Sequence, residues 1–287
     1  MTKFPSEVNR VYITNAPGGQ AANEEIPPSK LLHNIRGIIF DFDGTLFDNA
    51  RIPFHLIAAY PPDMLRIRNE RLIRKNFGGC DYSSPEEYYN AFFTALAKVC
   101  LSSPQRIRDW YYNRYMPRMV YVLKKHYKPR PGVRELFARL NLSTEKNLPM
   151  AAVYSDYPFL RERLEALGLY PAKRISLYGP ESFGAQKPAV RPFRQIAENM
   201  GVAPEEVLVI GDREDTDGLG AFHAGMRFFC LETGRRRYFR LDPNRRYEEE
   251  QPRGPSLVMY TSVWDNLIKL LLDQTAAGIS KANTAAV

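Results

Sequence analysis

The sequence predicts an α/β protein: a doubly wound parallel sheet, Rossmann-like in plan, with an inserted α-helical domain. From residue 130 onward, apolar runs of strand length alternate with helical patterns, which is typical of a parallel sheet covered by helices. Residues 51–128 instead carry apolar residues at three- and four-residue spacing without β alternation. The 287 residues, 44% of them apolar, suffice for one sizeable core or two modest domains.

The core elements follow one another in a regular order. The first strand spans residues 36–41, and the chain returns to the core after Arg130-Pro131-Gly132. Further strands are expected at 150–154, 173–178, 207–211, 227–231 and 256–260, and helices at 133–140, 158–167, 191–200, 216–224 and from 262 through 271. We therefore assign residues 31–49 and 130–275 to the α/β core.

The insertion, residues 50–129, is expected to contain several helices. Pro85 after Ser83-Ser84 and Pro104 after Ser102-Ser103 both have the pattern of a helix start, with a serine cap and proline in the first turn. Its clustered aromatic residues, such as Tyr88-Tyr89 and Phe92-Phe93, could line a pocket. Aromatic residues at helical spacing more often form a core, and we prefer that interpretation.

The two ends of the chain lack the pattern of folded elements. Residues 1–30 mix proline, glycine and charged residues with little apolar periodicity, so we expect a mostly disordered arm, and residues 276–287 a disordered tail. No stretch reaches the ~18 apolar residues of a membrane span, and the N-terminus lacks the apolar core of a signal peptide. A cytoplasmic location is the default expectation.

Cysteine and histidine spacing offers no metal or catalytic pattern. The three cysteines, Cys80, Cys100 and Cys230, are widely separated, and we expect them to form no disulfides. The four histidines form no local ligand pattern, and none is proposed as catalytic.

The net charge of +8 is concentrated in the insertion. Residues 51–130 hold fifteen Lys or Arg and six Asp or Glu, a local charge of +9. Any single residue there, such as Arg66 or Lys124, is best read as part of a solvated helix face, but together they suggest an anionic substrate. A second basic cluster at 235–246 precedes Glu248–Glu250 and is expected to be a mobile loop. Nucleic acid is an unlikely partner, because no reader fold accompanies the charge.

Four polar motifs follow or flank the predicted strands. The first strand ends in Asp41-Phe42-Asp43-Gly44-Thr45, where Asp41 and Asp43 start on one face of an extended chain and Gly44 permits a sharp turn. The other three motifs are Ser155-Asp156, Lys187-Pro188 and the segment from Gly211-Asp212 to Asp217. Each alone has an ordinary interpretation, such as a polar turn, a helix cap or a surface lysine. In a parallel sheet, however, strand carboxyl ends open on one edge, so we expect Asp41, Asp43, Ser155, Lys187, Asp212 and Asp217 to gather there.

These four motifs, in this order, resemble the haloacid dehalogenase superfamily of phosphohydrolases over roughly residues 36–275. The resemblance is to the phosphatase branch, similar to phosphoglycolate phosphatases, in which a helical cap is inserted after the first motif. It implies that Asp41 is the nucleophile and forms an aspartyl phosphate, and that Asp43 is the general acid and base. Ser155 would bind a phosphoryl oxygen, and Lys187 would supply fixed positive charge.

The resemblance also implies a magnesium ion. Mg²⁺ prefers octahedral oxygen coordination and keeps several waters, so Asp41, Asp212 and the backbone carbonyl of Asp43 suffice as ligands, with Asp217 near the metal or its waters. Glu214 and Asp215 are less suited. We expect both to be polar loop residues, and Asp215 to cap the helix that follows.

The expected function is a magnesium-dependent phosphatase acting on a small phosphorylated metabolite, because a closing cap leaves little room for a macromolecule. Asp43 argues against the dehalogenases, which lack a second aspartate at this position. Two alternatives stay open: a phosphomutase of the same superfamily, and a non-catalytic regulatory protein that binds phosphorylated ligands. The sequence names neither the substrate nor the oligomeric state.

Overall fold

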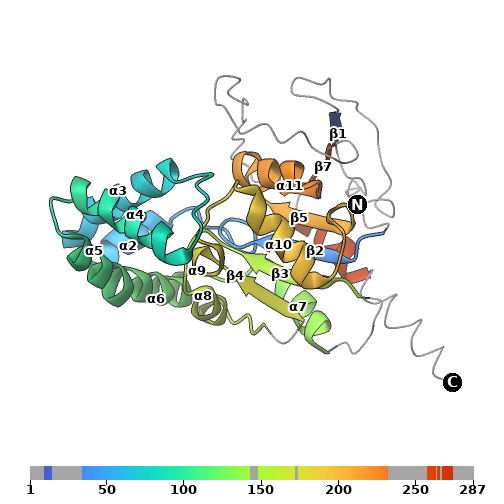
Figure 1. The fold of residues 1–287 in the computed structure, drawn as a ribbon. Coiled ribbons are helices and arrows are strands. Elements are labelled where there is room, and N and C mark those ends of the chain that lie inside the picture. The colour runs from blue at the N-terminus through green and yellow to red at the C-terminus, as the bar shows by residue number, and fades with distance from the viewer. Residues whose placement is uncertain are drawn as a thin grey trace.

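A computed structural model of the chain describes residues 10–14, 34–142, 148–171, 174–231, 257–262, 264–265 and 267–273. Figure 1 shows an α/β core with a separate group of helices beside it. The predicted fold class, an α/β core with an inserted helical domain, is confirmed.

Seven strands form a single sheet. They are β1 (Arg10–Thr14), β2 (Gly37–Asp41), β3 (Met150–Tyr154), β4 (Ile175–Tyr178), β5 (Val207–Gly211), β6 (Arg227–Leu231) and β7 (Leu257–Ser262). The strand order is β1-β7-β6-β5-β2-β3-β4, and every neighbouring pair is parallel except β1 with β7. All residues of β2 and β5 are buried, as expected of parallel strands covered on both faces.

Strand β1 is a departure from the expected disordered arm. Residues 10–14 pair with β7 in antiparallel register, from Arg10 opposite Thr261 to Thr14 opposite Leu257. The segment Arg-Val-Tyr-Ile-Thr is rich in β-branched and aromatic residues, and the edge of a sheet offers it backbone partners that local composition does not reveal. The rest of the arm, the basic segment 235–246 and the tail lie outside the described residues.

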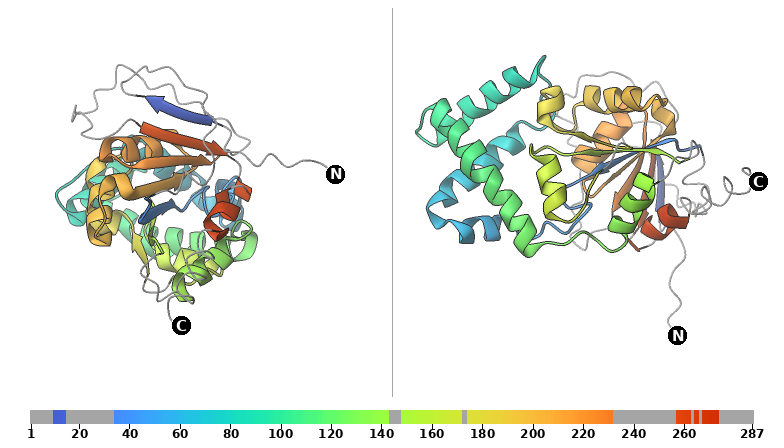
Figure 2. Two further views of the ribbon diagram at one scale, coloured as in Figure 1. Left: turned by 90° about the vertical axis from the view of Figure 1, so that its right-hand side faces the viewer. Right: turned by 90° about the horizontal axis from the view of Figure 1, so that it is seen from below.

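Helices cover both faces of the sheet (Figure 2). One face packs against α7 (Val133–Leu142), α8 (Leu160–Ala166) and the helical residues 267–273. The other packs against α9 (Pro180–Phe183), α10 (Val190–Met200) and α11 (Leu219–Ala224). Because both faces are buried, polar groups of the core collect at the strand ends.

The insertion contains five α-helices: α2 (Ile52–Ala59), α3 (Met64–Asn76), α4 (Pro85–Val99), α5 (Pro104–Trp110) and α6 (Met116–His126). The helix starts at Pro85 and Pro104 are confirmed, because the hydroxyls of Ser84 and Ser103 accept hydrogen bonds from the amides of Glu87 and Arg106 at 3.2 and 3.3 Å. A 3₁₀ turn, Pro61–Asp63, and a π-helical segment, Tyr111–Tyr115, connect the helices. The aromatic residues Tyr88, Phe92, Phe93 and Tyr111 are buried and contact one another, so they form the core of this helical domain.

Within the described residues, no helix combines the length and the apolar character that a membrane crossing requires. Cys80, Cys100 and Cys230, all of them described, take part in no disulfide.

Candidate active site

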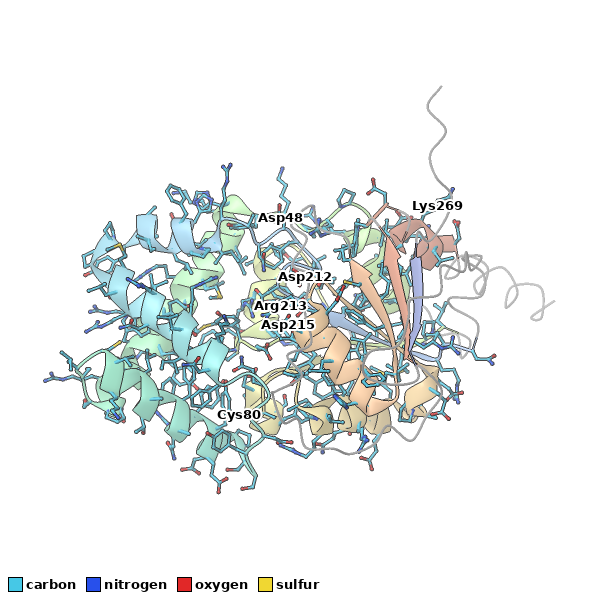
Figure 3. The ribbon with its side chains drawn as sticks, turned by 90° about the horizontal axis from the view of Figure 1, so that it is seen from above. Asp48, Cys80, Asp212, Arg213, Asp215 and Lys269 are labelled. Atoms are coloured by element: carbon cyan, nitrogen blue, oxygen red, sulfur yellow. The ribbon has the colours of Figure 1, made fainter. Side chains whose placement is uncertain are left out.

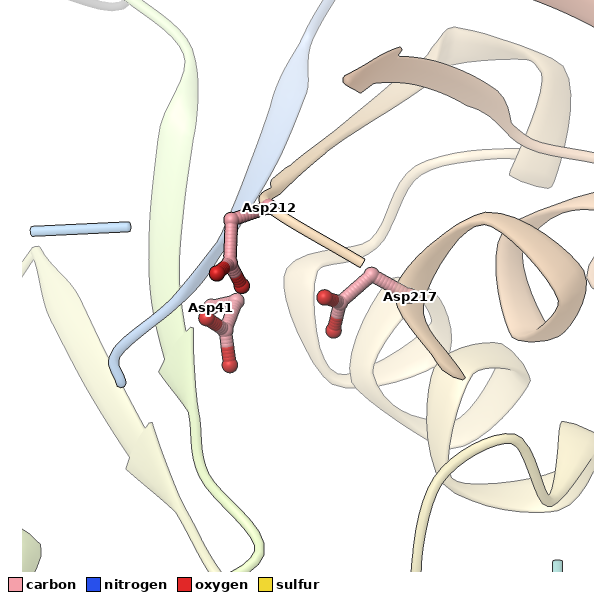
Figure 4. Close-up of side chains that lie close together, drawn as sticks. All are labelled: Asp41, Asp212 and Asp217. Atoms are coloured by element: carbon pink, nitrogen blue, oxygen red, sulfur yellow. The ribbon is translucent and has the colours of Figure 1, made fainter. Parts of the chain in front are cut away.

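Three aspartates meet at the carboxyl edge of the sheet (Figure 4). Asp41 is the last residue of β2, Asp212 follows β5, and Asp217 lies in the π-helical segment Glu214–Gly218. One carboxylate oxygen from each lies within 4.8 Å of the other two. The structure thus brings together three of the predicted site residues from two central strands.

Lys187 reaches into this group of carboxylates. Its Nζ donates to Oδ1 of Asp41 at 2.6 Å and to Oδ1 of Asp217 at 2.7 Å, and the side chain is only 2% exposed. Burial alone would lower the pKa of Lys187, but Asp217 and Asp41 raise it well above the usual value. Thr45 donates to the other oxygen of Asp41 at 2.8 Å, so both oxygens of that carboxylate are held.

The group carries more negative charge than Lys187 can balance. Burial, reinforced by Asp217, raises the pKa of Asp41 to about 7, and burial with Asp41 raises that of Asp212 to about 8. Oδ1 of Asp212 is buried and has no hydrogen-bond partner among the described residues. Buried polar atoms are normally satisfied, and carboxylate oxygens are the ligands that Mg²⁺ prefers. The donor set therefore fits a divalent cation.

Two glycines allow the aspartates to approach the backbone. Gly44 has φ of +101°, and a β-carbon there would overlap Oδ2 of Asp212. A β-carbon at Gly211 would lie 2.5 Å from Oδ2 of Asp217. A β-carbon at either position would therefore push the neighbouring aspartate out of its place.

The side chain of Asp43 lies outside the group of three carboxylates. Its Oδ2 accepts from the Ser155 hydroxyl at 3.1 Å, and its Oδ1 forms an ion pair with Arg163. The amide of Tyr157 also donates to the Ser155 hydroxyl, at 3.1 Å. Asp41 and Asp43 thus occupy different environments although only Phe42 separates them.

Arg163 is a site residue that the sequence reasoning missed. It projects from α8, is 0% exposed, and its Nη1 donates to the Ser155 hydroxyl at 2.9 Å. The guanidinium lies 4.5 Å from the ring centroid of Phe42. A signal was present: Arg163 falls in the apolar stripe of Leu160, Leu164 and Leu167, and an arginine on a buried face needs a partner.

The model of the haloacid dehalogenase-like hydrolase family matches residues 35–225, about two thirds of the chain. The chain belongs to this family. Membership of this hydrolase family confirms the expectation, drawn from the four motifs, that the protein is an enzyme.

Curated relatives of this hydrolase are distant. A glyceraldehyde 3-phosphate phosphatase from Methanopyrus kandleri is 30% identical over 128 residues, which are 44% of this chain and 48% of the relative. The chain therefore spans about half the length of that relative. A phosphoglycolate phosphatase from Shigella boydii is 27% identical over 62% of this chain and 74% of the relative. Among solved structures, the 2-haloacid dehalogenase from Pseudomonas syringae has a TM-score of 0.51 at 17% identity, covering 83% of this chain and 99% of the other, which shows a shared fold.

Arg130 is a second residue beside the site that the sequence analysis did not single out. It follows α6, where the chain returns to the core, and donates to the backbone carbonyls of Thr45 at 3.0 Å and Gly44 at 2.9 Å. From the sequence alone, Arg130 is only part of the segment Arg130-Pro131-Gly132, after which the chain returns to the core. The structure shows that the returning linker holds the turn after Asp41.

The remaining acids of the Gly211–Asp217 segment lie apart from the carboxylate group. Asp215 forms an ion pair with Arg213 at 2.6 Å, and Glu214 accepts from the Cys230 thiol at 3.9 Å. Figure 3 shows Asp212, Arg213 and Asp215 on the side of the core that faces the helical domain. The prediction that Asp215 caps the next helix was wrong, because a π-helical segment intervenes and Gly218 precedes α11.

A hollow of about 360 Å³ lies between the helical domain and the core. Its lining includes Tyr89 and Tyr112 from the helical domain and Phe159, Leu177 and Glu181 from the core. None of the predicted site residues lines this hollow.

Proposed function

We propose that this hydrolase is a magnesium-dependent phosphatase that cleaves a small phosphorylated metabolite through an aspartyl phosphate on Asp41. One observation carries the proposal: three carboxylates converge around Lys187 while a buried oxygen of Asp212 has no partner among the described residues. Nucleophilic attack with separate proton transfer requires two acids in unlike surroundings, and Asp41 and Asp43 meet this requirement.

Magnesium would be held by Asp41, Asp212 and the backbone carbonyl of Asp43, with Asp217 close to the ion or its waters. The ion would supply positive charge that offsets the negative charge of the phosphoryl oxygens and of the carboxylates. In its absence a pKa of about 7 leaves Asp41 partly protonated at neutral pH, and a pKa of about 8 leaves Asp212 mostly protonated. A protonated Asp41 is a poor nucleophile.

In the first chemical step, a carboxylate oxygen of Asp41 attacks phosphorus, and the bond from phosphorus to the ester oxygen breaks. Asp43 gives its proton to the departing oxygen. Ser155 and Lys187 hold phosphoryl oxygens by hydrogen bonding and charge. In the second step, water attacks the aspartyl phosphate, Asp43 takes a proton from that water, and phosphate leaves with Asp41 restored.

Arg163 has a place in this scheme as the residue that orients Asp43. It contacts both Asp43 and Ser155, so it fixes the proton donor next to a phosphate-binding hydroxyl. Proton transfer from Asp43 to the leaving oxygen is faster when the side chain of Asp43 is held in a fixed orientation.

The substrate is proposed to be a small phosphate ester, because the curated relatives are phosphatases named for phosphoglycolate and glyceraldehyde 3-phosphate. The excess of basic residues in the helical domain supports an anionic substrate as well. The three cysteines without disulfides agree with the proposed cytoplasmic location.

The test is a screen of phosphorylated metabolites, phosphoglycolate and glyceraldehyde 3-phosphate among them, with release of inorganic phosphate as the readout. Turnover is expected with Mg²⁺ and its loss is expected in excess chelator. Full activity without a divalent metal would contradict the magnesium assignment. Absence of turnover on every ester, with retained phosphate binding, would instead support the regulatory alternative.

A phosphomutase would use the same carboxylates. The reaction products distinguish a phosphomutase from a phosphatase. Phosphate release without any bisphosphate requirement supports the phosphatase. An isomerised sugar phosphate, detected by ³¹P NMR, would support the mutase.

A further inference from the structure

The helical domain contacts the core through a short backbone ladder as well as through its two covalent linkers. The amide of Gly79 donates to the carbonyl of Lys187 at 3.1 Å, and that of Tyr82 to Gly184 at 3.0 Å. Between them, the amide of Gln186 donates to the carbonyl of Cys80 at 3.0 Å. Figure 3 labels Cys80 at this junction. The segment that carries Lys187 is therefore paired with the loop that follows α3.

Arg74, near the end of α3, reaches the other phosphate-binding loop. Its Nη1 donates to the backbone carbonyl of Asp156, next to Ser155, at 2.7 Å. The guanidinium lies 4.0 Å from the ring centroid of Tyr157 and 4.6 Å from that of Phe92. One arginine of the helical domain thus packs on the loop that follows β3.

The same residue also contacts the Lys187 segment. The side-chain amide of Gln186 donates to the backbone carbonyl of Arg74 at 2.9 Å, and its oxygen accepts from the hydroxyl of Tyr88 at 3.1 Å. The two loops are joined to each other as well, because the amide of Lys187 donates to Oδ1 of Asp156 at 3.0 Å. Arg74 therefore lies where both loops meet.

Arg74 is itself fixed by buried partners. It is 5% exposed, its Nε donates to Glu70 at 2.7 Å, and its Nη2 donates to the hydroxyl of Tyr111 at 2.8 Å. Tyr115 donates to the second oxygen of Glu70 at 3.1 Å. A buried ion pair is weak evidence of stabilisation in itself, since desolvation offsets the attraction. Its place beside the two loops suits a role in setting their geometry.

We propose that Arg74 is a positioning residue of the active site, which holds the Ser155 loop and the Lys187 loop at a fixed spacing. It touches no reacting atom: its guanidinium donates to the backbone carbonyl of Asp156, and its own backbone carbonyl accepts from the side-chain amide of Gln186. The helical domain is then part of the catalytic framework and not only a cover over it. The effect on turnover rests on the proposed function, whereas the effect on loop geometry does not.

The test compares two variants with the wild-type full chain. Arg74→Met is combined with Glu70→Gln, so that no charged carboxylate stays buried without its partner. The matched control combines Arg118→Met with Asp63→Asn, which removes another ion pair, Arg118 with Asp63 at 2.8 Å, inside the helical domain and away from both loops. Circular dichroism and thermal unfolding establish that each variant is folded.

Hydrogen–deuterium exchange followed by mass spectrometry gives the first readout. In the Arg74 variant, peptides containing residues 155–157 are expected to exchange at least tenfold faster, because the guanidinium contact with Asp156 is lost. Peptides containing residues 184–188 are expected to follow, because the amide of Lys187 donates to the side chain of Asp156, while the strands of the core keep their wild-type rates. The Arg118 control should leave these two regions unchanged. Wild-type exchange in both loops of a folded Arg74 variant would overturn the proposal, as would equal acceleration in the control.

Turnover of an aryl phosphate with Mg²⁺ gives the second readout. The Arg74 variant is expected to lose at least tenfold in kcat, and the Arg118 control less than twofold. Unchanged kcat in the Arg74 variant would overturn the catalytic part of the proposal. If the wild-type protein hydrolyses no phosphate ester, the proposed function fails, and the exchange measurement still decides whether Arg74 holds the loops.

Discussion

Arg163 and Asp43 form an ion pair next to the hydroxyl of Ser155, although 120 residues separate them in the chain. The guanidinium is wholly buried while the carboxylate keeps some access to solvent. The arginine therefore anchors one end of the pair, and the carboxylate of Asp43 keeps part of its surface open to solvent.

Replacing Arg163 by Met is expected to affect leaving groups unequally. A displaced Asp43 no longer protonates the leaving oxygen, so kcat should fall by about 10²-fold or more for an alkyl phosphate. For 4-nitrophenyl phosphate, whose leaving group needs little protonation, the fall should be much smaller. Steady-state kinetics on both esters measures this, with Arg161→Met, an exposed neighbour on α8, as control. Equal losses on both esters would contradict the assignment.

Replacing Asp41 by Asn is expected to remove turnover while the protein stays folded. The amide keeps the shape of the side chain but is a poor nucleophile, so kcat/KM should fall by at least about 10³-fold. Asp48→Asn is the control, because Asp48 is exposed in the segment that follows β2 and, within the described part of the chain, accepts a hydrogen bond from the amide of Ala50 at 2.9 Å alone. Near-wild-type rates in the Asp41 variant would exclude it as the nucleophile.

Asp212 and Asp215 should differ sharply in their effect on metal binding. Asp212→Asn removes a charged oxygen from the carboxylate group, and the Mg²⁺ concentration for half-maximal activity should rise by about 10- to 100-fold or more. Asp215→Asn breaks only the pair with Arg213 and should leave that concentration nearly unchanged. Isothermal titration calorimetry with Mg²⁺ checks binding without turnover. A similar loss of Mg²⁺ affinity in both variants would contradict the assignment of Asp212, and not Asp215, as the metal ligand.

The metal-free protein should become less stable as the pH rises. Burial raises the pKa of Asp41 from 3.8 to about 7 and that of Asp212 from 3.8 to about 8. A carboxyl whose pKa is higher in the folded state favours folding at low pH, and that contribution is lost as the pH rises through the folded value. In EDTA the contribution of these two carboxyls should therefore make the unfolding temperature fall between about pH 4 and pH 8. Excess Mg²⁺ should reverse the fall, and Asp212→Asn should weaken it.

Gly44→Ala should cost both stability and metal binding. Its φ of +101° strains any residue with a β-carbon, and the added atom also displaces Asp212. The matched control is Gly201→Ala, where φ is +67° and no atom lies within 4 Å of the new carbon. Both variants should lose roughly 1–2 kcal/mol of unfolding free energy, and only the first should also weaken Mg²⁺ binding. Wild-type Mg²⁺ affinity in a folded Gly44→Ala variant would argue against close packing of Asp212.

The strands of the core could be predicted because their local pattern is strong. Strands β3, β5 and β6 lie at the predicted residues, and β2 and β4 begin one or two residues later than expected. Each is a short apolar run bounded by polar or glycine residues, so periodicity alone identifies it. The parallel order of the strands then explains why Asp41, Lys187, Asp212 and Asp217 meet.

The arginines of the site could not be predicted in the same way. Arg74, Arg130 and Arg163 lie on helices or in a linker, and their partners come from elements distant in the chain. The local sequence can predict that an arginine lies on a helix, but it does not predict which loop packs against that arginine. The same limit applies to β1, whose partner β7 lies at the other end of the sequence.

The central position of β2 has a consequence for the order in which the chain folds. Its neighbours β3 and β5 both follow the whole insertion in the chain, so on the ribosome β2 emerges long before either can pair with it. The five helices between them contact mainly nearby residues and can form early. Once they have assembled, Arg130 reaches the turn after Asp41, and the effective distance between β2 and β3 becomes short. The insertion that covers the site would then also act as an internal guide for assembly of the sheet beneath it.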